Sequence, residues 1–172
     1  DWGLGHTTRC IPIINELLLQ NCEVFIAAEG ASEVILREEF TKATFLPLKG
    51  YRIRYTSNRF LQWGLIARLP RVMLAVYNER RWLRHIIKDI RIDGVISDNR
   101  FGLHNKKIPC VYITHQLLIK TGDWITGKIA QKIHWHFIKK FNACWVPDDQ
   151  HDGLAGDLSH PPSLPPNTIK IF

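Results

Sequence analysis

Reactive groups are concentrated at the start of the sequence, where a histidine follows two closely spaced glycines in Gly3-Leu4-Gly5-His6. Glycines suit a tight turn from a strand into a helix, because they adopt backbone angles that other residues avoid. The first N–H groups of a helix lack partners within it and favour an anion such as phosphate. His6 adds an imidazole that can take or give a proton near neutral pH. The pattern therefore predicts an anion-binding turn beside a proton-transferring group.

Further polar residues follow apolar segments that are typical of buried strands. Residues 93–98 end in Asp98, and residues 109–115 end in His115. Ligands bind parallel sheets at the carboxyl ends of their strands, so we expect the residues there to share one edge of the sheet. The residues expected to contact substrate at this edge are Gly3, Gly5, Thr7, Asn99, Arg100, His115 and Gln116.

The clearest catalytic pair is His6 with Asp98. A carboxylate on one imidazole nitrogen fixes the tautomer and stabilises the imidazolium that forms when the ring takes a proton. Such a pair could deprotonate a hydroxyl group. The alternative interpretation is that His6 only caps or packs against the start of the helix, and that His115 is a hydrogen-bonded group at a strand end.

Metal and dinucleotide sites are less favoured by the pattern. No set of Cys and His residues has the spacing of zinc ligands, and His134 and His136 would face different directions on a helix. We therefore expect no metal and no bound cofactor. Glu29 could be the ribose-binding acid of a dinucleotide fold, but Thr8 stands where the third glycine of that fingerprint would be. A dinucleotide-dependent dehydrogenase stays a less favoured alternative.

Strand-like and helix-like segments alternate along the 172 residues, which suffice for an α/β domain with its own core. Strands separated by helices indicate a parallel sheet, so the predicted fold is α/β and Rossmann-like, with helices flanking the sheet. Ser32 is the expected N-cap of its helix, and Pro70 is expected to break the helical pattern around it. The expected helices span 8–20, 33–40, 78–90 and 124–141, and the expected strands span 24–28, 44–48, 93–98, 109–115 and 143–148, with a further one beginning at 169.

Basic residues outnumber acidic ones, 23 to 16, which gives a net charge of +7. Residues 51–91 hold ten of the bases and only two acids, Glu79 and Asp89. This local excess favours an anionic partner such as lipid head groups, phosphate or nucleic acid. No recognition helix or RNA-binding motif is visible, so we expect no nucleic-acid partner.

Two segments, 60–77 and 124–141, mix large apolar residues with Lys and Arg, as segments at a membrane surface do. The commoner alternative is that one face packs on the sheet and the basic face is solvated. No apolar run is long enough to span a membrane, and no signal-peptide pattern opens the chain. The cysteines are scattered singly, as buried free thiols in a reducing cytoplasm would be. We expect a cytoplasmic protein, peripheral on the inner face of the cell membrane, which it contacts through Phe60, Trp63, Leu65, Arg68 and Arg71.

Four segments carry a resemblance to known enzymes: Gly3-Leu4-Gly5-His6-Thr7-Thr8-Arg9-Cys10, Glu23-Val24-Phe25-Ile26-Ala27-Ala28-Glu29-Gly30, Val95-Ile96-Ser97-Asp98-Asn99-Arg100-Phe101-Gly102 and Tyr112-Ile113-Thr114-His115-Gln116. In this order they resemble the N-terminal half of GT-B glycosyltransferases, in particular the MurG-like bacterial group. The likeness covers nearly the whole chain. The first turn is less rich in glycine than in MurG, so the MurG acceptor is not carried over.

The resemblance implies two Rossmann-like domains that face each other across a cleft. The N-terminal domain would bind the acceptor, with His6 as general base, Asp98 as its support, and Gly3 and Gly5 near a diphosphate. It also implies an apolar patch, ringed by basic residues, that meets a membrane carrying a lipid-linked acceptor. Residues 1–157 would form the acceptor-binding domain, preceded by a first strand that lies before Asp1, and the proline-rich residues 158–172 would lead to the donor-binding domain.

The predicted function is therefore the acceptor-binding half of an inverting glycosyltransferase that needs no metal. The nucleotide-sugar donor would be a co-substrate, held mainly by the second domain. Two alternatives stay open: a non-catalytic module that binds the acceptor and docks a split enzyme on the membrane, and a GT-B epimerase that acts on a nucleotide sugar alone.

Overall fold

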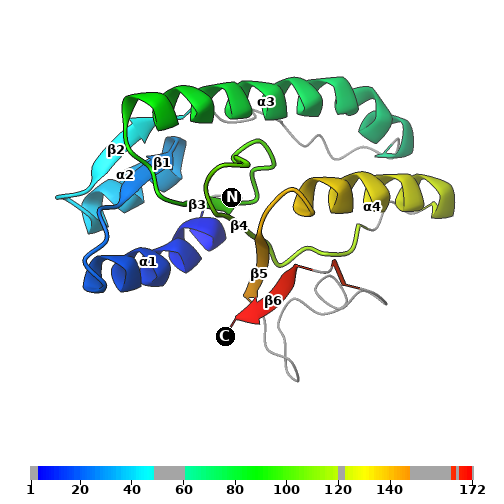
Figure 1. Cartoon of the computed structure of the whole chain (residues 1–172). Helices are drawn as coiled ribbons and strands as arrows, with labels where there is room; N and C mark the ends of the chain where they lie inside the picture. Colours follow the sequence, from blue (N-terminus) through cyan, green and yellow to red (C-terminus); the bar gives the residue numbers. More distant parts are fainter. Residues whose placement is uncertain (1–3, 49–60, 120–122, 148–163, 166, 172) are drawn as a thin grey trace. The chain divides into compact units, whose positions relative to one another are not determined.

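The computed structural model describes residues 4–48, 61–119, 123–147, 164–165 and 167–171 (Figure 1). The chain divides into two compact units, Asp1–Ile53 and Arg54–Phe172. Both units place helices beside parallel strands, so the predicted α/β class with parallel sheets flanked by helices is confirmed. This arrangement is compatible with a Rossmann-like fold. The domain boundary expected after residue 157 lies outside the described residues.

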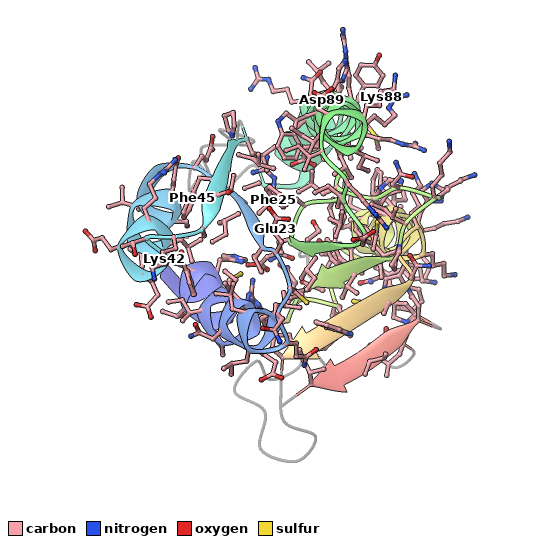
Figure 2. The ribbon with its side chains drawn as sticks, turned by 60° about the vertical axis from the view of Figure 1, so that its left-hand side comes forward. Glu23, Phe25, Lys42, Phe45, Lys88 and Asp89 are labelled. Carbon is pink, nitrogen blue, oxygen red and sulfur yellow. The ribbon has the colours of Figure 1, made fainter. Side chains whose placement is uncertain are left out.

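The first unit contains α1 (Leu4–Leu19), β1 (Phe25–Ala28), α2 (Gly30–Glu39) and β2 (Thr44–Pro47). The two strands are parallel neighbours, and Figure 2 shows Phe25 on β1 and Phe45 on β2. Such a pair needs a helical crossover, which α2 provides. The core of this unit takes one residue each from α1, β1 and α2, together with the C-cap residue of α2: Ile14, Ile26, Leu36 and Phe40.

Two helix starts differ from the sequence prediction. Helix α1 begins at Leu4 and not at Thr8, so Gly5 and His6 lie in its first turn and not in a turn before it. Helix α2 begins directly at Gly30, with Glu29 at its N-cap position, so the prediction of Ser32 as N-cap is wrong. The reason is the backbone of Gly30, whose φ of 64° turns the chain into the helix within one residue.

The second unit contains the other six elements. They are α3 (Leu61–Asp89), β3 (Val95–Asp98), β4 (Cys110–Ile113), α4 (Trp124–Ile138), β5 (Ala143–Pro147) and β6 (Thr168–Ile171). The described strands of this unit form a four-stranded parallel sheet in the order β3-β4-β5-β6. The strand expected from residue 169 is therefore part of this sheet, paired with β5.

Helix α3 is continuous through Pro70, where a break was expected. A proline removes one backbone hydrogen bond from a helix and crowds the preceding turn, but it does not forbid the next turn from forming. Residues with good helix propensity follow it, among them Arg71, Met73, Leu74 and Ala75. The segments 60–77 and 78–90 thus belong to one long helix.

The core of the second unit is built around Tyr112 of β4, which is almost fully buried. Its ring lies 5.3 Å from that of Phe101 and 5.0 Å from that of Phe141, measured between ring centroids. Phe101 also stacks on Phe137 of α4 at 5.0 Å. These contacts join the loop after β3, strand β4 and helix α4 into one aromatic cluster, and such ring pairs add to the stabilisation from burial alone.

The cysteines are free thiols, as predicted, but they are not all buried. Cys110 and Cys144 lie in the core of the second unit, where burial raises the pKa of Cys144 to about 12. Cys10 is half-buried and Cys22 is exposed. The expectation of burial is therefore wrong for Cys22, because it follows the end of α1, where Asn21 turns the chain with a φ of 59°.

The loop after β3 packs directly on α3 at Gly102. A Cβ atom at Gly102 would overlap the Cβ of Glu79 and would lie 2.5 Å from the carbonyl oxygen of Val76. Real side chains do not approach a backbone oxygen so closely, so the helix and the loop can meet only if this residue is glycine.

The substitution Gly102→Ala should lower the free energy of unfolding by about 2 kcal/mol, since it overpacks a buried contact. Urea denaturation of the purified chain measures the change. The matched control is Gly94→Ala in the same unit, where the nearest atom would lie at an ordinary 3.6 Å. Equal stability of the two variants would contradict the proposed close packing.

Candidate functional site

The predicted substrate-binding residues of the second unit gather at one edge of its sheet. Strands β3 and β4 are parallel neighbours, and Asp98 at the end of β3 is paired in register with Ile113 at the end of β4. Asn99 and Arg100 follow β3, whereas His115 and Gln116 follow β4. Their predicted neighbourhood is thus confirmed, and their contact with a substrate stays a prediction.

The turn after β3 is held in an unusual backbone conformation at Asn99. This residue has a φ of 53°, in the left-handed region that asparagine tolerates better than most side chains. Its N–H donates to the carbonyl oxygen of Ile113 at 3.1 Å, and its Oδ1 accepts from the hydroxyl of Tyr112 at 3.3 Å. The turn is therefore tied to β4 by both backbone and side chain.

Arg100 forms an internal ion pair with Glu79 of α3. Its Nε donates to Glu79 Oε1 at 2.6 Å, and the two side chains are 17% and 3% exposed. The second carboxylate oxygen, Oε2, accepts the N–H of Gly102 at 2.9 Å. The observed partner of Arg100 is thus a structural one, and the expected contact of Arg100 with substrate stays a prediction.

Sequence reasoning missed Glu79, although a signal for it was present. Glu79 is one of only two acids among ten bases in residues 51–91. An isolated acid in a strongly basic helix is a candidate for a specific cationic partner, because buried carboxylates need pairing. What the sequence could not show is which of the many arginines pairs with it.

Helix α4 fixes the segment after β4. His134 Nε2 donates to the carbonyl oxygen of Gln116 at 2.9 Å. The side chain of Gln131 makes two hydrogen bonds to the residues that follow Gln116. Its Nε2 donates to the carbonyl oxygen of Leu117 at 2.7 Å, and its Oε1 accepts from the N–H of Ile119 at 2.8 Å. His115 and Gln116 therefore sit on a backbone that is braced by α4.

His134 and His136 face different directions, as predicted, since His134 is buried and His136 is exposed. Burial lowers the pKa of His134 to about 4, although its hydrogen bond to the Gln116 carbonyl acts in the opposite sense. His134 is thus a neutral N–H donor near pH 7. Buried His104, which hydrogen-bonds the Phe101 carbonyl, is similar, because burial also lowers its pKa.

The remaining predicted residues belong to the first turns of α1. Gly5 is exposed, His6 is half-buried, Thr7 is buried, and Gly3 lies outside the described residues. A guanidinium N–H of Arg9 donates to Nδ1 of His6. Arg9 was not predicted as a site residue, although its position three residues after His6 places both side chains on one face of a helix.

The proposed pairing of His6 with Asp98 stays a prediction. His6 belongs to the first unit and Asp98 to the second. The residues expected at a membrane also stay predictions: Phe60 and the side chains of Trp63, Leu65 and Arg68 lie outside the described parts, and Arg71 is exposed on α3.

Two features are absent from the described residues. No helix there is long and apolar enough to cross a bilayer. Nowhere in the same residues do three His, Cys, Asp or Glu side chains come close enough to hold a metal ion.

No protein-family model, curated protein or solved structure matches the chain. The described residues with candidate chemistry form two separate sets, one in each unit. The sheet edge offers the carboxylate of Asp98 and the polar side chains of Asn99, His115 and Gln116, which can hydrogen-bond a hydroxyl-rich ligand. The start of α1 offers an imidazole beside a guanidinium, which suits proton transfer and anion binding.

Removal of the buried carboxylate by Glu79→Ala should lower the free energy of unfolding by about 3 kcal/mol, because it takes the observed carboxylate partner from Arg100 in a largely buried site. Urea denaturation tests this. The control is Asp89→Ala, an exposed acid of the same helix, with an expected change below about 0.5 kcal/mol. The double variant Glu79→Ala/Arg100→Ala should be less destabilised than Glu79→Ala alone. Equal effects of Glu79→Ala and Asp89→Ala would refute the structural importance of the pair.

His134 should make the stability depend on pH. Between about pH 6.5 and pH 4 the unfolded chain binds a proton at His134 that the folded chain does not, so the free energy of unfolding rises with pH in this window. His134→Gln, which keeps a side-chain donor, should reduce the loss between pH 7 and pH 4 by about 2 to 3 kcal/mol. Urea titrations at both pH values measure it. His85→Gln, at an exposed histidine of α3, should leave the pH dependence unchanged, and an unchanged dependence in His134→Gln would contradict the assignment.

Proposed function

We propose that the chain is the acceptor-binding part of an inverting glycosyltransferase, which moves a sugar from a nucleotide-sugar donor to a hydroxyl group. The observation that carries the proposal is the parallel pair β3–β4, which brings residues 98–100 and 115–116 to one sheet edge. Ligands of parallel α/β sheets bind at this edge. The resemblance of residues 95–102 and 112–116 to GT-B enzymes supplies the reaction class.

The acceptor would be bound by the polar groups of this edge. A carboxylate, an amide and an imidazole can each hydrogen-bond a sugar or polyol hydroxyl. The two segments that carry them are held by buried contacts, with Glu79 on one side and His134 and Gln131 on the other. Such support favours a preorganised site, which lowers the entropy lost when the acceptor is oriented.

In the proposed mechanism His6 removes the proton of the acceptor hydroxyl as the oxygen attacks the anomeric carbon. The attack comes from the face opposite the nucleotide leaving group, so the configuration inverts. Asp98 would accept the Nε2–H of the ring and stabilise the imidazolium. The acceptor hydroxyl would then take the place of Arg9 at Nδ1, and the released guanidinium would suit a phosphate group of the substrate.

The nucleotide-sugar donor would be held mainly by a further domain. In this proposal the first turn of α1 contributes N–H groups and the charge of Arg9 toward the diphosphate. This proposal specifies neither the donor sugar nor the acceptor. The first experiment therefore tests the full-length protein with a panel of nucleotide sugars and hydroxyl acceptors.

Once transfer is detected, His6→Gln should lower kcat by about 100-fold or more, since a general base contributes at least that much. Asp98→Asn should also lower kcat, because the amide stabilises an imidazolium less well than a carboxylate does. Product formation is followed by mass spectrometry. The control His85→Gln changes an exposed histidine of α3 and should keep the wild-type rate.

Three results would count against parts of the proposal. Near-wild-type turnover of a folded His6→Gln variant would refute the base. Isomerised nucleotide sugar without acceptor would indicate an epimerase. Acceptor binding without any transfer would indicate a non-catalytic module.

A further inference from the structure

Helix α4, which is labelled in Figure 1, has two faces of opposite character. One face enters the core through His134, Phe137 and Ile138. The exposed side chains of the other face, here called the α4 face, alternate between large apolar and cationic or ionisable types. They are Trp124, Ile125, Lys128, Ile129, Lys132 and His136.

The first two turns of the α4 face expose an unusual amount of apolar surface. Trp124 is 71% exposed, Ile125 59% and Ile129 49%. Ile125 and Ile129 are neighbours because they are four residues apart on the helix, and Trp124 belongs to the same first turn as Ile125. Single exposed apolar residues are ordinary, whereas a contiguous set of this size marks an interaction surface.

The same face is positively charged and contains no acid. Residues 124–141 include four lysines and neither Asp nor Glu. The ammonium group of Lys128 lies 3.9 Å from the ring centroid of Trp124, so charge and aromatic surface are adjacent. The nearest acid in sequence, Asp123, caps the helix, and its carboxylate accepts the N–H of Thr126 at 2.9 Å. A complementary partner must therefore offer negative charge and an apolar phase together.

We propose that the α4 face docks the protein on the surface of a bilayer that contains anionic lipids. Trp and Ile side chains enter the interface between head groups and acyl chains, and lysines beside them bind anionic head groups. Nucleic acid would satisfy the lysines and leave the apolar residues in water. This inference does not depend on the proposed glycosyl transfer, and it involves a helix other than the one that carries Phe60–Arg71.

The test is co-sedimentation of the full chain with vesicles of phosphatidylcholine alone and of phosphatidylcholine mixed with phosphatidylglycerol. The wild type should bind only the mixed vesicles, and high salt should weaken the binding. Each lysine near an anionic surface strengthens binding about fivefold, so Lys128→Gln/Lys132→Gln should weaken it about 25-fold. Trp124→Ser/Ile125→Ser should weaken it about tenfold or more, since two large side chains no longer leave water.

Matched controls alter equally exposed residues elsewhere. Arg84→Gln/Lys88→Gln on α3 removes the same charge, and Leu18→Ser/Leu19→Ser on α1 removes similar apolar surface. The Leu18→Ser/Leu19→Ser control should bind as the wild type does, and Arg84→Gln/Lys88→Gln, which lies in the basic segment 51–91, should weaken binding less than Lys128→Gln/Lys132→Gln does. Thermal unfolding of every variant should be unchanged, because all these side chains are exposed.

Failure of the wild type to bind mixed vesicles would overturn the proposal, as would equal binding to both vesicle types. Binding lost equally in the controls would also overturn it. Self-association that disappears in the α4 variants, with vesicle binding intact, would assign the α4 face to a second copy of the chain. None of these outcomes bears on the glycosyl-transfer assay.

Discussion

One buried carboxylate governs the arrangement of the second unit. Glu79 is nearly inaccessible to water, and burial of a charge is costly unless partners replace the lost hydration. Its two oxygens accept from the Arg100 side chain and from the Gly102 backbone, so a single residue of α3 determines the path of the loop after β3. The contact also needs Gly102 itself, because any side chain there would collide with the helix backbone. Asp98 and Asn99 directly precede Arg100 in the chain, so this contact between α3 and the loop also constrains their positions.

A second brace acts on the neighbouring loop with neutral groups. His134 and Gln131 of α4 satisfy backbone groups of residues 116–119, and the ring of His134 packs edge-on against Phe101. A neutral imidazole suits this place, since its N–H meets a carbonyl oxygen and the charged form would be poorly solvated. The two loops of the sheet edge are thus held by different helices. Helix α3 holds the loop after β3, and helix α4 holds the segment after β4. In both cases the contact comes from a buried side chain of the neighbouring helix.

Each proposed function uses a different part of the described structure. The sheet edge presents hydrogen-bonding side chains on a braced backbone, which suits the binding of a hydroxyl-rich acceptor. The start of α1 presents a reactive combination outside that edge, an imidazole with a guanidinium at its Nδ1. The α4 face uses the outer side of the helix that braces the edge, so a lipid surface at this face would lie on the same unit as the proposed acceptor site.

The sequence by itself determined the class of fold and most elements, because apolar runs and helical spacing are local properties. It also brought residues 98–100 and 115–116 to one edge, since parallel strands share their carboxyl ends. The predicted starts of α1 and α2 are wrong, and so is the predicted break of α3 at Pro70. Each of these predictions depended on a single weak local signal, whereas the neighbouring residues favour a continuing helix. Tertiary structure alone decided that Arg100 meets Glu79, 21 residues earlier, and that His134 is buried while His136 is exposed. Such facts depend on which helix face meets the sheet, and no short pattern of residues contains them.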